Sequence, residues 1–322
     1  MKRSVIAAFV MFVVSACVAG QTISTAAGRQ SVSRTLAERL GYSTDAKLLI
    51  VHADDLGMAH SVNAASIKAF EIGLVNSGSI MVPCPWLAEI AAYVRSHPEA
   101  DLGLHLTLTS EWSLFRWGPV LSKDRVPSLL ARDGYLYPTE TDAAKQADGR
   151  EAEAEIRAQI ERAKAFGIQP THLDSHMGTL YQTEALFRVF LRVSRENKLP
   201  LRMSKNWLDR APFIAANLGP DDIVIDRIME INPSVKPEGW AAFYTDAIKS
   251  LQPGVTEMVV HLAYDDEEMH AATINHPDWG AGWRQRDYDF FTSTAFRRLL
   301  QENNIKLITW REIGQLMRKP KA

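Results

Sequence analysis

Short apolar segments with β character alternate with amphipathic helical segments through nearly the whole chain, beginning at Lys47. Strand-type segments are expected at 47–52, 77–82, 102–108, 171–177, 200–204, 256–261 and 305–310. Helical periodicity lies between several of them, at 62–74, 85–96, 151–166, 184–197 and 293–303. This alternation predicts one α/β domain with a parallel sheet, either a closed barrel or an open doubly wound sheet. The polar, aromatic stretch 111–149 interrupts the rhythm and is expected to be an inserted loop.

The N-terminal residues have the layout of an export signal. Lys2 and Arg3 precede a short apolar run and then small residues, so a signal peptide is expected over 1–20. The sequence before Cys17 resembles a lipobox, and both lipidation of Cys17 and ordinary cleavage nearby fit it. An irregular lead-in is then expected over 21–45 and the folded domain over 46–318. The mature protein is therefore expected outside the cytoplasm, either periplasmic or anchored to a membrane through a lipid on Cys17.

Composition narrows the range of partners. The 36 basic and 38 acidic residues nearly balance, which gives no electrostatic reason to expect nucleic acid. Cys84 would be the one cysteine left outside the signal, so no disulfide within the mature chain is expected. Its apolar surroundings predict a buried side chain. An oligomer is compatible with all of these features.

Residues of the types that bind metals follow three of the expected strands. They are Asp54 and Asp55 after the first strand, His105 on the third, and His172, Asp174 and His176 on the fourth. In a parallel sheet the carboxyl ends of the strands meet at one edge, so these side chains are expected to come together. The last three share one face of their strand because side chains alternate.

Two histidines and a carboxylate are a ligand set that leaves positions open for water and substrate on a catalytic divalent ion. A second carboxylate nearby, unbound to the metal, can act as a general base, and the pair Asp54 and Asp55 offers one of each. Each residue also has a structural alternative. His105 alone could be a core residue, the aspartate pair could cap a helix, and His172 is better explained by a hydrogen bond within its strand.

The combination resembles one known family, the YdjC-like (ChbG/HpnK) carbohydrate deacetylases, which are relatives of the NodB-type polysaccharide deacetylases. The resemblance lies in 48–57 (LLIVHADDLG), 103–105 (GLH), 170–176 (PTHLDSH), 201–202 (LR), 259–261 (VVH) and 286–310. It implies a distorted (β/α) barrel with about seven strands. It further implies one divalent metal ion, magnesium or zinc, and removal of the acetyl group from a saccharide that contains N-acetylglucosamine.

The same resemblance implies roles for individual residues. The metal ligands would be Asp55, His105 and His176. Asp54 would be the general base and His261 the acid that protonates the departing amine. Arg202 would orient Asp54 or help to hold the tetrahedral oxyanion, with a surface salt bridge as the alternative.

Saccharide contacts are expected from Asp174, Trp112 and Trp117, although packing over the mouth of the barrel explains the tryptophans equally well. Two rival functions remain open at this stage. A histidine two residues before an aspartate, with a distant histidine, also suits an iron oxygenase, but that motif normally lies on an antiparallel jelly roll. The second rival is an exported saccharide-binding protein on the same fold that lacks activity.

Overall fold

The computed structural model describes residues 34–208 and 211–318. Within these ranges seven strands form one sheet in which every pairing is parallel. The strands are β1 (Lys47–Leu56), β2 (Ser77–Ile80), β3 (Leu102–Leu106), β4 (Leu173–Ser175), β5 (Arg227–Glu230), β6 (Gly254–His261) and β7 (Ile305–Leu307). Their order is β4-β3-β2-β1-β6-β5, and β7 pairs with the first residues of β1. The parallel α/β sheet confirms the predicted fold class and differs from the jelly roll of the oxygenase alternative.

The sheet curls into a distorted barrel, and an irregular segment bridges its two edges. Leu201 forms a parallel bridge with Leu173 of β4, and Ser204 forms another with Ile225, just before β5. Backbone hydrogen bonds support both bridges, because Arg202 donates to Leu173 and Ile225 donates to Met203. The segment expected as a strand at 200–204 is therefore a pair of bridges, and the strand on that side is β5, which sequence patterning missed.

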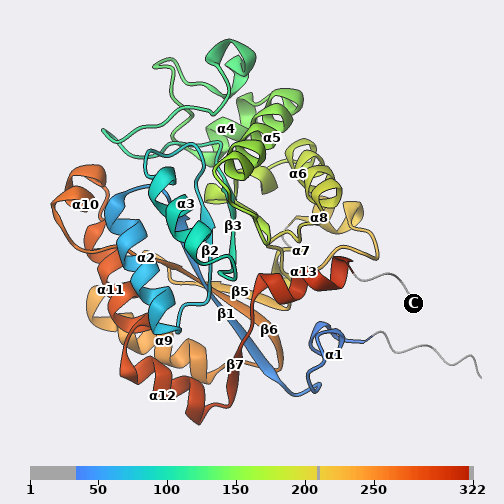
Figure 1. The fold of residues 1–322 in the computed structure, drawn as a ribbon, viewed down its shortest axis with the longest axis vertical. Coiled ribbons are helices and arrows are strands. Elements are labelled where there is room, and N and C mark those ends of the chain that lie inside the picture. The colour runs from blue at the N-terminus through green and yellow to red at the C-terminus, as the bar shows by residue number, and fades with distance from the viewer. Residues whose placement is uncertain (1–33, 209–210, 319–322) are drawn as a thin grey trace, which may run out of the picture. The chain divides into compact units, whose positions relative to one another are not determined.

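Helices surround the curled sheet (Figure 1). They are α1 (Leu36–Arg39), α2 (His60–Ile72), α3 (Leu87–Ser96), α4 (Glu140–Gln146), α5 (Gly149–Ala165), α6 (Glu184–Asn197), α7 (Lys205–Leu208), α8 (Pro212–Asn217), α9 (Trp240–Lys249), α10 (Glu267–Ala272), α11 (Ala281–Phe291), α12 (Thr294–Glu302) and α13 (Trp310–Arg318). None of the helices in the described ranges is long and apolar enough to cross a membrane.

The side chains inside the barrel form layers along β1. Leu49 and Val51 point outward into the main core beneath the helices, whereas Leu48 and Ile50 join a second apolar cluster with Trp310. Because side chains alternate along a strand, His52 and Asp54 continue the inward row. The interior is thus apolar at the amino ends of the strands and polar toward their carboxyl ends, where ligands bind in such folds.

Several boundaries differ from the sequence expectation, and β4 is Leu173–Ser175 instead of 171–177. The lead-in expected over 21–45 contains α1, which begins with a capping box between Thr35 and Glu38 and buries Ala37. The last strand ends at Leu307, and Trp310 begins α13 instead of ending the strand. The expected signal peptide, including Cys17, lies outside the described residues. Cys84 is buried, as predicted.

Candidate metal centre

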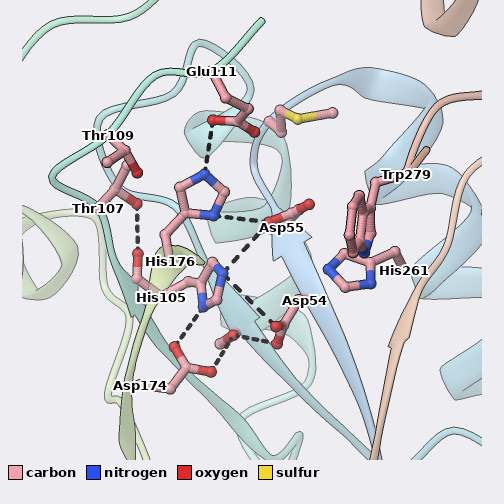
Figure 2. Close-up of polar contacts among 12 residues, drawn as sticks. Asp54, Asp55, His105, Thr107, Thr109, Glu111, Asp174, His176, His261 and Trp279 are labelled. Carbon is pink, nitrogen blue, oxygen red and sulfur yellow. Dashed lines mark hydrogen bonds and ion pairs between the residues drawn. The ribbon is translucent and has the colours of Figure 1, made fainter. Parts of the chain in front are cut away.

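A bulge in β1 brings two adjacent carboxylates to the same side. The register between β1 and β2 shifts between Ala53 and Leu56, and Asp55 has a φ of 70°. In a regular strand Asp54 and Asp55 would point to opposite faces. The bulge and the left-handed backbone instead turn both side chains toward the carboxyl end of the barrel (Figure 2).

Asp55, His105 and His176 converge at this edge of the sheet (Figure 2). Oδ1 of Asp55 lies 3.5 Å from Nε2 of His105 and 3.4 Å from Nδ1 of His176. Donor atoms about 2.1 Å from a tetrahedral zinc ion are roughly 3.4 Å apart, so these separations suit one ion. Oδ1 of Asp55 is also buried without a hydrogen-bond partner among the described residues. The donor set therefore fits a divalent metal ion.

Each of the two histidines has a carboxylate on its other ring nitrogen. Nδ1 of His105 lies 2.6 Å from Asp174, and Nε2 of His176 lies 3.0 Å from Glu111. Carboxylate partners of this kind fix the ring orientation and tautomer of metal-binding histidines. Glu111 begins the inserted stretch after β3, so this loop contributes directly to the site.

Asp174 does not fit the saccharide contact expected of it. Its side chain is fully buried, and Ser79 and Arg202 hold its second oxygen while His105 holds the first. It therefore holds the ring of His105, one of the three candidate metal ligands.

Arg202 is buried and holds Asp54 with two contacts, at 2.6 and 3.1 Å. This position excludes the surface salt bridge and agrees with a role in orienting Asp54. Burial opposes ionisation of Asp54, but Arg202, His105 and His52 together outweigh it and hold the pKa of the carboxyl well below its usual range. Asp54 is thus a carboxylate at neutral pH, able to accept a proton.

His261 ends β6 and lies on the other side of the aspartate pair from the two histidines (Figure 2). Its backbone N–H donates to Asp287 at 3.0 Å, and its Nδ1 is 3.8 Å from Glu230. Burial lowers the pKa of His261 to about 4, so its ring is neutral near pH 7.

The structure places the predicted aromatic residues differently from the expectation. Trp112 and Trp117 are only 2% and 4% exposed. The indole N–H of Trp112 donates to Met58 and that of Trp117 to the Thr109 carbonyl. Both rings are packed within the protein, which agrees with the packing alternative rather than with an open surface for stacking. Trp279 is the partly exposed indole beside His261.

His172 makes contacts of the structural kind expected for it, although its Nε2 has no hydrogen-bond partner among the described residues. Its ring stacks on Trp310, and its Nδ1 lies 2.9 Å from Thr171. It also forms a second cluster of metal-type residues with His52 and Asp174. There, however, serines occupy both ring nitrogens of His52 and Asp174 already holds His105.

Sequence reasoning missed Arg284 and Glu111. Arg284 is 1% exposed and donates to Oδ2 of Asp55 at 2.6 Å. Burial opposes ionisation of Asp55, but Arg284 and His176 hold the pKa of its carboxyl well below its usual range. No spacing rule points to these two residues, because a helix far along the chain and an inserted loop carry them.

Comparison with known proteins gives one family over most of the chain. The family model described as "YdjC-like protein" matches residues 48–302. A carbohydrate deacetylase of Thermus thermophilus is 32% identical over 288 residues, covering 88% of this chain and 99% of that protein. Another from Geobacillus stearothermophilus is 34% identical over 272 residues, covering 83% of this chain and 98% of that protein.

A solved structure has the same fold. A putative cellobiose-phosphate cleavage protein from Enterococcus faecalis superposes with a TM-score of 0.70 at 25% identity, covering 83% of this chain and 99% of that chain. With the family model matched from β1 to the end of α12, the chain belongs to the YdjC-like protein family.

Proposed function

We propose that this protein hydrolyses the N-acetyl group of a saccharide that contains N-acetylglucosamine and releases acetate. One divalent ion held by Asp55, His105 and His176 would serve the reaction. The observation that carries the proposal is Oδ1 of Asp55, which has no hydrogen-bond partner among the described residues and lies at nearly equal distances from a nitrogen of each histidine. The relatives named carbohydrate deacetylases support the reaction class.

Zinc or magnesium could fill such a centre, and the donor chemistry favours zinc. Magnesium sites use mainly oxygen ligands, whereas imidazole nitrogens suit zinc and other transition metals. Such an ion, when bound, lowers the pKa of bound water toward 7 and polarises a carbonyl oxygen.

The residues around the centre have complementary tasks in this mechanism. Asp54 takes a proton from the attacking water, and Arg202 keeps its carboxylate ionised and oriented. The leaving amine must be protonated before the C–N bond breaks, and His261 delivers this proton from the side opposite to the two histidines. Because its ring is neutral at rest, His261 has to receive this proton before it delivers it, and the source is the attacking water, whose proton Asp54 removes.

We propose further that the enzyme acts outside the cytoplasm. The basic residues Lys2 and Arg3 and the apolar run that ends before Cys17 support export. Mass spectrometry of the mature N-terminus tests this proposal. A lipid-modified Cys17 or cleavage near residue 20 would support it, and an intact N-terminus would contradict it.

Acetate release from a panel of N-acetylated saccharides tests the activity, with the metal-free protein reloaded with zinc or magnesium. We expect acetate from at least one N-acetylglucosamine saccharide and none from the deacetylated sugar. Asp54→Asn is the catalytic control, and Asp45→Asn, at an exposed position outside the site, is its matched partner. Saccharide binding without acetate from any substrate would favour the non-catalytic binding protein.

A further inference from the structure

One buried arginine contacts both the candidate metal centre and Trp279, a partly exposed residue at the rim of the site. Arg284 lies in α11 and is 1% exposed. Its Nη2 donates to Oδ2 of Asp55 at 2.6 Å, and its Nε donates to the backbone carbonyl of Trp279, also at 2.6 Å. The guanidinium also lies 5.8 Å from the centre of the Trp112 ring. These contacts fix the guanidinium between the bulge of β1 and the loop before α11.

Both residues held by Arg284 have an unusual backbone. Asp55 has a φ of 70° and Trp279 a φ of 55°, in the left-handed region that residues other than glycine rarely adopt. Such conformations cost of order 1 kcal/mol or more each, and they persist when surrounding contacts enforce them. The charged hydrogen bond from Arg284 to Asp55 and its hydrogen bond to the carbonyl of Trp279 are contacts that can enforce these two conformations.

The contact with Arg284 makes the two carboxylate oxygens of Asp55 different from each other. Oδ2 is occupied by Arg284, whereas Oδ1 has no hydrogen-bond partner among the described residues and faces His105 and His176. A carboxylate free of such a partner can place both oxygens on a metal ion. With Oδ2 held, Asp55 offers a single oxygen.

We propose that Arg284 is the positioning residue of the metal centre. It restricts Asp55 to ligation through Oδ1 and fixes Trp279 at the rim through the same guanidinium. This inference rests on the proposed function, since it assumes that Asp55, His105 and His176 hold the ion. α11 would thus contribute to the metal centre although it carries none of the three proposed ligands.

Cobalt(II) titration of the metal-free protein tests the inference, because the visible spectrum of the ion reports its coordination number and geometry. The variants are Arg284→Gln, Arg284→Lys and Arg286→Gln. Arg286 is the matched control, since it lies in the same helix, carries the same charge and packs over Trp240. Circular dichroism and thermal unfolding without metal show whether each variant folds.

We expect Arg284→Gln to bind cobalt at least tenfold more weakly, the lower end of the usual effect of removing a partner of a ligand. Its spectrum should be weaker in intensity, as the coordination number rises when both oxygens of Asp55 reach the ion. Arg286→Gln should bind cobalt like the wild type. Arg284→Lys should show a smaller loss than Arg284→Gln, because an ammonium can hold Oδ2 but lacks the geometry to hold the Trp279 carbonyl as well.

Wild-type affinity and spectrum in Arg284→Gln would overturn the inference while leaving the proposed function intact. If Arg284→Gln does not fold, Arg284→Lys decides, and wild-type affinity and spectrum in that variant would overturn the inference. Failure of the wild-type protein to bind cobalt would instead contradict the metal centre itself.

Discussion

Asp54 and Asp55 are adjacent in sequence, but their partners give them different chemistry. Arg202 contacts both oxygens of Asp54, whereas Arg284 contacts one oxygen of Asp55 and leaves the other facing the histidines. The first arrangement suits a carboxylate that receives a proton, and the second suits a metal ligand. At the residue scale, therefore, two buried arginines distinguish the proposed general base from the proposed metal ligand.

Replacing Asp54 tests this distinction. Asp54→Asn should lower kcat by about 10²–10⁴-fold, the usual contribution of a general base, because an amide cannot accept the proton of the attacking water. The metal affinity should stay within a few fold of wild type, since Asp55 and the histidines are unchanged. Acetate release and metal titration on the same preparation measure both quantities. A variant that loses the metal together with the activity would show Asp54 to be a ligand.

Glu257 gives a pH-dependent prediction. Burial raises the pKa of this carboxyl to about 7, although His52 and Arg202 oppose the increase. The folded protein therefore binds this proton more tightly than the unfolded chain, whose value is near 4.5. The contribution of Glu257 to stability consequently falls as the pH rises from about 4.5 to about 7.

Glu257→Gln removes this titration. The free energy of unfolding of the variant relative to wild type should therefore increase across the same pH interval, by at most about 3 kcal/mol. Urea unfolding of both proteins at several pH values measures the difference. A difference that stays constant with pH would mean that Glu257 titrates alike in both states.

At the scale of elements, the sequence pattern predicts the strands that carry the site. β1, β3 and β6 are near expectation because each is a largely apolar run, whereas β4, expected over 171–177, is only Leu173–Ser175. β5 was not predicted because it has only four residues, Arg227 to Glu230, with a charged residue at each end. Its strand conformation depends on pairing with β6, which no local pattern reveals.

Site residues, too, could be predicted from the sequence only where a local pattern or the strand topology places them. Asp54, Asp55 and His105 lie near the carboxyl ends of their strands and His176 directly follows β4, so topology alone could place them. Arg284 and Glu111 come from a helix and a loop whose approach depends on tertiary packing. The bulge that turns Asp55 inward has no signal in the sequence either, since its left-handed residue is an aspartate and not a glycine.

Gly103 shows how closely the elements pack inside the barrel. A Cβ on this residue of β3 would lie 2.5 Å from Nε2 of His172, whose ring is held between Trp310 and His52. Gly103→Ala should therefore cost about 1–3 kcal/mol of stability through overpacking.

The matched control is Gly118→Ala, because a Cβ there meets no atom within 4 Å among the described residues. It should change the free energy of unfolding by less than about 0.5 kcal/mol. Chemical unfolding of both variants measures the two costs. Equal costs at the two positions would contradict the packing argument.

At the scale of the whole molecule, the candidate metal centre joins distant parts of the chain. Its donors and their partners come from β1, β3, the end of β4, the inserted loop and α11. Buried carboxylates and imidazoles meet there, and Oδ1 of Asp55 has no hydrogen-bond partner among the described residues. An ion that binds only the folded protein should therefore stabilise all of these elements together.

Metal removal measures this coupling. Chelation should lower the Tm, and restoring an ion at 100 times its Kd should return about 2.7 kcal/mol of stability. His176→Gln lacks one ligand and should show a much smaller shift on adding the ion. An equal shift in His176→Gln would place the stabilising ion elsewhere in the molecule.

The most direct test of the account is the rate of acetate release from an N-acetylated saccharide as metal is added to the metal-free protein. We expect negligible release without metal and a rise to a plateau at one equivalent of a tightly bound ion. His105→Gln should show no such rise at the same metal concentrations. Full activity without metal, or an unchanged titration in His105→Gln, would contradict a metal centre built on Asp55, His105 and His176.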